Sequence, residues 1–191
     1  MKRLILASAS PRRRDLLAEV GLRFEVIPSS VEEEHQDGLS PLEVARTLAG
    51  EKAADVASRL TSGIVIGADT IVVLDGEILG KPKDPEDAFQ MLRRLSGRSH
   101  EVITALVLIE AESGKMMTGQ ETTRVFFKEM TDREISAYIS TGEPMDKAGA
   151  YGIQGKGMLL IRRIQGCYTN VVGLPMMKLT EMLSEMGVRI L

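Results

Sequence analysis

The stretch LILASASPRRRDLLAEVG (residues 4–21) decides the fold, because it joins a strand to a helix within a few residues. Leu4 to Ala7 has the apolar character of a short buried strand, and Pro11 to Val20 is typical of a helix closed by Gly21. Arg12–Arg14 therefore occupy the first helical turn, where the helix dipole is already positive. Either these arginines are simply solvated, or the turn binds an anion.

The remaining chain alternates strands and helices in an order that favours an α/β or α+β fold with a mixed sheet over a purely parallel sheet. A buried strand begins at Ile64, breaks at Gly67–Thr70, and continues to a hairpin at Asp75-Gly76. Capping boxes begin helices at Ser40 and Thr131. The other expected strands are 23–27, 101–110, 116–128 and 158–164, and the other expected helices are 84–97 and 174–186, the last preceded by a loop over 170–173.

Composition limits the class of protein. With 191 residues the chain is a single domain, or one domain with two lobes. The net charge of −3 argues against nucleic-acid binding, and no apolar run approaches the length of a membrane span. The short apolar run after Lys2-Arg3 leads into a helix rather than a cleavage site, so we expect a cytoplasmic protein. A single cysteine, Cys167, excludes an internal disulfide framework.

Two acidic features are candidates for a metal or a general base. Asp69 follows an apolar strand in GADT, where it could hold Mg²⁺, accept a proton from water, or merely cap a turn. The run Glu32-Glu33-Glu34 is either a solvated loop or the source of one carboxylate that completes a metal site with Asp69.

Several polar residues suit a phosphorylated ligand. Ser8 and the arginines of the first helix offer hydroxyl and forked guanidinium donors to phosphate oxygens. Lys81 in GKP and Lys52 in the middle of a helix are possible phosphate contacts, although lysines in such positions are often only solvated. Gln154, in a glycine-rich segment, either reads the edge of a base or belongs to a floppy loop.

Other site types are absent from the sequence. His35 and His100 share no spacing typical of a zinc site. The P-loop pattern and the GxSxG nucleophile elbow do not occur.

Taken together, the spaced motifs resemble one family over nearly the whole chain. The motifs are SASPRR, the glutamate-rich loop, EKA, GADT, GKP, DKAGAYGIQG and NVVGLP. In this order they are similar to the Maf family of nucleotide pyrophosphatases, named for inhibition of septum formation. The resemblance implies a single domain over residues 1–191, with an elongated mixed α/β sheet and two lobes around a deep nucleotide cleft, similar to the inosine-triphosphate pyrophosphatases.

The same resemblance assigns roles by position. It implies Asp69 as the catalytic base and, with Glu33, as a ligand of a divalent metal, Mg²⁺ or Mn²⁺. The residues that would surround the triphosphate are Ser8, Arg12, Arg13, Lys52 and Lys81. The branch of the family that prefers dTTP and UTP is marked by Arg12, Thr70 and Gln154, all of which are present.

The implied activity is hydrolysis of the α–β phosphoanhydride bond of dTTP and UTP, and of modified uridine triphosphates, in a house-cleaning role. Members of the family are usually dimeric, so we expect a homodimer. The alternative is a regulator of cell division that binds a nucleotide and acts through a protein partner without significant turnover.

Overall fold

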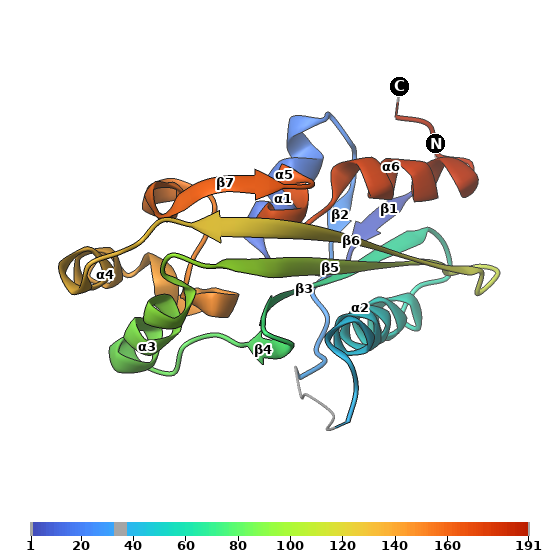
Figure 1. Cartoon of the computed structure of the whole chain (residues 1–191). Helices are drawn as coiled ribbons and strands as arrows, with labels where there is room; N and C mark the ends of the chain where they lie inside the picture. Colours follow the sequence, from blue (N-terminus) through green and yellow to red (C-terminus); the bar gives the residue numbers. More distant parts are fainter. Residues whose placement is uncertain (1, 33–37, 191) are drawn as a thin grey trace. The chain divides into compact units, whose positions relative to one another are not determined.

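A β-sheet of mixed direction runs through the chain, whose computed structural model describes residues 2–32 and 38–190 (Figure 1). The strand order in this described part is β2-β1-β3-β5-β6-β7, and β4 pairs with β3. This confirms the expected α/β class with a mixed sheet. The strands are β1 (Leu4–Leu6), β2 (Glu25–Val26), β3 (Ile64–Leu74), β4 (Glu77–Leu79), β5 (Ser99–Glu110), β6 (Met116–Phe127) and β7 (Ile161–Gln165).

The chain divides into two compact units. The first contains residues 1–69, 104–121 and 173–191, and the second contains residues 70–103 and 122–172. Strands β3, β5 and β6 each pass from one unit into the other. Of the helices that the structure describes, none combines the length and the hydropathy needed to cross a membrane.

In the first unit, β1 pairs in parallel with both β2 and β3, and its three residues are all buried. Both faces of a parallel strand are normally covered, which explains its unbroken apolar sequence. The helices of this unit are α1 (Pro11–Glu19), α2 (Pro41–Ala57) and α6 (Met176–Glu185). The capping box expected at Ser40 is confirmed, because Ser40 Oγ accepts from the Glu43 N–H and the Glu43 carboxylate accepts from the Ser40 N–H.

The expected break in β3 at Gly67–Thr70 is wrong, since β3 is continuous from Ile64 to Leu74. Gly67 is needed for a different reason. A Cβ atom at this position would lie 2.3 Å from the backbone oxygen of Ala49 and 2.7 Å from the Cβ of Ala53. The glycine therefore allows α2 to pack directly against the strand, without interrupting it.

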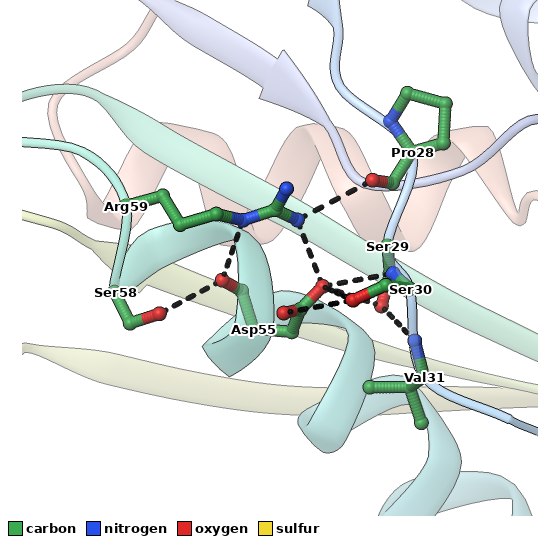
Figure 2. Close-up of polar contacts among 7 residues, drawn as sticks. All are labelled: Pro28, Ser29, Ser30, Val31, Asp55, Ser58 and Arg59. Atoms are coloured by element: carbon green, nitrogen blue, oxygen red, sulfur yellow. Dashed lines mark hydrogen bonds and ion pairs between the residues drawn. The ribbon is translucent and has the colours of Figure 1, made fainter.

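Asp55 of α2 fixes the segment that follows β2, as Figure 2 shows. Its carboxylate accepts hydrogen bonds from the Ser29 hydroxyl and the Ser30 N–H, both at 2.9 Å, and pairs with Arg59 at 2.8 Å. The Ser30 N–H, followed by the Ser29 hydroxyl, lowers the pKa of Asp55. This segment leads into the glutamate-rich loop, of which Glu33 lies outside the described residues.

In the second unit, β3 and β4 form the expected hairpin, with Asp75 and Gly76 both at positive φ. The core beneath it is built from aliphatic and aromatic side chains, among them Leu92, Phe127 and Tyr138. The helices of this unit are α3 (Pro85–Leu95), α4 (Asp132–Ile139), α5 (Tyr168–Val172) and the 3₁₀ helices η1 (Glu143–Asp146), η2 (Ala148–Ala150) and η3 (Gly155–Leu160).

Two expectations for this unit were wrong at their boundaries. The strand expected over 158–164 begins only at Ile161, because Met158–Leu160 completes η3. Residues 170–172, expected in a loop, belong to the short helix α5. Asn170 of that helix is buried and donates to the backbone oxygen of Val102 at 3.0 Å, a long-range contact that local sequence does not reveal.

Candidate functional site

The turn between β1 and α1 determines which hydrogen bonds the hydroxyl of Ser8 accepts and which it can still donate. Ser8 Oγ accepts hydrogen bonds from the Ser10 N–H and from Nη1 of Arg13, each at 3.2 Å. A hydroxyl oxygen has two acceptor positions, and these two bonds use both of them. Toward any further partner Ser8 is therefore a proton donor, which suits an anion at the start of α1.

Arg13 connects this turn to a distant part of the same unit. Its Nε atom donates to the backbone oxygen of Gly173 at 2.7 Å, and its side chain is buried. Arg12 on the same helix is half-buried, and the first turn of α1 carries no acidic residue. Arg13 is thus held by the protein itself, and Gly173 is a partner that the sequence analysis did not identify.

Lys52 and Asp69 form a buried ion pair within the first unit. The distance from Lys52 Nζ to Asp69 Oδ1 is 2.7 Å, and the two side chains are only 9% and 8% exposed. Lys52 stands on α2 and Asp69 on β3, two residues beyond the glycine that lets these elements approach. Desolvation makes a buried ion pair expensive, so its presence favours a functional role for this carboxylate over a turn cap.

The donor set is compatible with a divalent cation that also binds phosphate. Asp69 supplies the carboxylate oxygen that Mg²⁺ and Mn²⁺ prefer, and Mg²⁺ in proteins often takes one or two carboxylates together with substrate phosphates. Among the described residues, no group of three or more histidine, cysteine, aspartate or glutamate side chains could hold a metal alone. Glu33, the other expected ligand, is not among those residues.

The remaining expected site residues belong to the second unit. Thr70 is half-buried in β3, Lys81 is exposed after β4, and Gln154 is exposed at the N-cap of η3. The structure brings Ser8 to Arg13 and Lys52 to Asp69, and neither of these contacts includes Lys81 or Gln154.

The glycine-rich segment around Gln154 is ordered by residues that the sequence analysis did not select for this role. His100, considered only as a zinc ligand, is buried, and its Nε2 lies 2.6 Å from the hydroxyl of Tyr151. Tyr138 and Glu143 contact the same segment. The glutamate in GEPMDK was the one available signal, because a carboxylate near glycines can accept from their exposed N–H groups.

These features define a mixed α/β protein with a donor-rich strand-to-helix turn and a buried lysine–carboxylate pair. Residues 3–186 match the family described as Maf-like protein, so the chain belongs to this family. A protein of Pelotomaculum thermopropionicum named dTTP/UTP pyrophosphatase is 51% identical over 100% of both chains. One of the same name from Alkaliphilus oremlandii is 54% identical over 94% of this chain and 93% of its own.

A solved structure gives a more distant likeness. The crystal structure of a nucleoside-triphosphatase / dITP/XTP pyrophosphatase from Mycobacterium abscessus matches 97% of this chain and 95% of that chain, with 15% sequence identity and a TM-score of 0.48.

Proposed function

We propose that this chain hydrolyses dTTP and UTP to the nucleoside monophosphate and pyrophosphate. The chief support is the set of full-length Maf-like relatives named dTTP/UTP pyrophosphatase, two of them 51% and 50% identical over nearly their whole length. The alternative, a nucleotide-binding regulator of cell division, predicts binding without turnover.

The triphosphate is proposed to bind at the start of α1. Arg12 and Arg13 offer guanidinium groups, and Ser8 offers the hydroxyl proton that its own contacts leave for donation. Lys81 and Lys52 are proposed as further cations around the phosphates. The absence of acids from the first turn of α1 supports this assignment, because the positive end of the helix and its arginines would then be compensated by the bound anion.

Asp69 is proposed as the base. Its carboxylate accepts the proton of the attacking water as the water oxygen bonds to the α-phosphorus. The bond from the α-phosphorus to the bridging oxygen breaks, and pyrophosphate leaves with the electron pair. The Lys52 ammonium, 2.7 Å from one carboxylate oxygen, orients Asp69 for this role. A divalent cation held by Asp69 and Glu33 would neutralise charge on the departing pyrophosphate.

Recognition of the substrate's nucleobase is proposed as the role of Gln154, together with Arg12 and Thr70. The edge of uracil and thymine presents an N3–H donor beside an O4 acceptor, which a glutamine amide can match with its own acceptor and donor. Cytosine presents the reverse order at these positions. Discrimination therefore requires that the amide of Gln154 be held in one orientation.

Product analysis tests this function directly. The purified protein is incubated with dTTP, UTP, CTP, GTP and 7-methyl-GTP and Mg²⁺ or Mn²⁺, and phosphate is assayed with and without inorganic pyrophosphatase. We expect phosphate only when the helper enzyme is present, mainly from dTTP and UTP, and none with Asp69→Ala. Nucleotide binding without product would favour the regulator instead.

A homodimer and a cytoplasmic location are further proposals, drawn from membership of the Maf-like family. Light scattering coupled to size exclusion measures the first, and cell fractionation measures the second.

A further inference from the structure

The segment that carries Gln154 is held at both of its ends by side chains from the same unit. On one side, the Gly152 N–H donates to the hydroxyl of Tyr138 at 3.3 Å. On the other side, the Lys156 N–H donates to both carboxylate oxygens of Glu143 at 3.1 Å, and the Gly157 N–H donates to one of them at 3.3 Å. Gln154 lies midway between these contacts, two residues after the first and two before the second.

Two glycines show how closely the segment fits its supports. A Cβ atom on Gly157 would lie 2.0 Å from the Gly152 oxygen and 2.7 Å from the Tyr138 hydroxyl. Gly155 has a φ of +63°, and a Cβ atom there would lie 3.0 Å from the Glu143 carboxylate. Larger residues would separate the two ends of the segment and push Glu143 away from the N–H groups that it accepts from.

The two supporting side chains belong to one small polar group. Burial, and then the nearby charge of Glu143, raises the pKa of Tyr138 to about 12, so its hydroxyl keeps its proton at any pH used for assay. Glu143 itself is placed by η1, whose backbone oxygen at Glu143 accepts from Nζ of Lys147 at 2.6 Å.

We infer that Glu143 is a positioning residue for base selection: its carboxylate closes the segment over residues 152–157 and so holds the backbone of Gln154 in one place. This inference rests on the proposed role of Gln154. A carboxylate suits the position because it accepts at both oxygens, whereas a glutamine in its place would turn an NH₂ group toward backbone donors.

The test is the preference for UTP over CTP, measured as the ratio of their kcat/KM values. Glu143→Gln should lower this ratio about tenfold, which corresponds to losing roughly one charge-assisted hydrogen bond. Glu129→Gln is the matched control, since it makes the same chemical change at an exposed residue of the same unit, and it should keep the wild-type ratio. A loss of folded protein lowers both rates equally and leaves the ratio unchanged.

A double variant separates positioning from an independent effect. In a Gln154→Ala background, Glu143→Gln should change the ratio no further, because the side chain that it positions is gone. If Gln154→Ala lowers the ratio and Glu143→Gln does not, the positioning role is wrong and the proposed function stands. If Gln154→Ala keeps the wild-type ratio, base reading by Gln154 is wrong, and the inference about Glu143 is overturned with it.

Tyr138→Phe gives a second route if Glu143→Gln does not fold. It keeps the buried ring and removes only the hydroxyl that accepts from Gly152. We expect it to lower the ratio by at least about threefold, since the bond from the Gly152 N–H is lost together with the interaction of the hydroxyl with Glu143. An unchanged ratio in this variant would contradict the view that the segment is held from both ends.

Discussion

Lowering the pH from 7 to 5 should reduce the free energy of unfolding by about 2 kcal/mol through His100 alone. His100 is 3% exposed and makes edge-to-face contacts with Phe127 and Tyr151. Its Nε2 bonds to the Tyr151 hydroxyl, and its Nδ1 has no partner among the described residues. A protonated ring would carry a donor on both nitrogens, so burial disfavours the charge and lowers the pKa of His100 to about 4.

The sign and size of this loss follow from the difference between the pKa of His100 in the folded chain and its pKa in the unfolded chain. The unfolded chain binds a proton at His100 below about pH 6.5, while the folded chain resists it until about pH 4. Between these values the unfolded state holds more protons, so the free energy of unfolding falls as the pH falls. The loss relative to pH 7 is about 2 kcal/mol at pH 5 and about 3 kcal/mol at pH 4.

Urea unfolding at pH 7, 6 and 5 measures this term in the wild type and in His100→Gln. Glutamine keeps a polar group and does not titrate, so the variant should lack the loss, while contributions from carboxylates cancel in the comparison. Tyr151→Phe, which retains the imidazole, should keep the pH dependence. Equal losses in the wild type and His100→Gln between pH 7 and pH 5 would refute this account of His100.

Three further predictions concern the first unit. Lys52→Met should destabilise the fold by about 3–5 kcal/mol in urea unfolding, because it leaves Asp69 buried without its ammonium partner; a loss near zero would contradict the ion pair. Gly67→Ala should lower Tm sharply, whereas Gly50→Ala in α2, with ordinary space for a methyl group, should raise it slightly. Asp55→Asn should lower Tm at pH 7. The difference from the wild type should shrink as the pH falls through the lowered pKa of Asp55, and a constant difference would exclude its charge as the cause.

Local signals in the sequence correctly predicted where most of the longer helices begin. The capping boxes at Ser40 and Thr131 and the hairpin at Asp75-Gly76 are all confirmed. Each depends on hydrogen bonds or backbone conformations within four residues, so the types of the neighbouring residues are enough to predict it.

The errors arose at residues whose role depends on contacts with segments that are distant in the sequence. Gly67 was interpreted as a break in a strand, but its lack of a side chain serves the approach of α2. Asn170 was placed in a loop, yet it is buried in α5 and bonds to Val102 and Thr123. A glycine or an asparagine has the same local preferences in both situations, and only the neighbours in space distinguish them.

The sequence by itself determined the class of fold, the start of α1 with its cluster of arginines, and, through the order of its motifs, the family. Only the tertiary structure decided how the site residues are used. It pairs Lys52 with Asp69, joins Arg13 to Gly173 across 160 residues, and ties the segment of Gln154 to Glu143. Caps and turns are fixed by short-range hydrogen bonds, whereas burial and ion pairing depend on which segments the completed fold brings together.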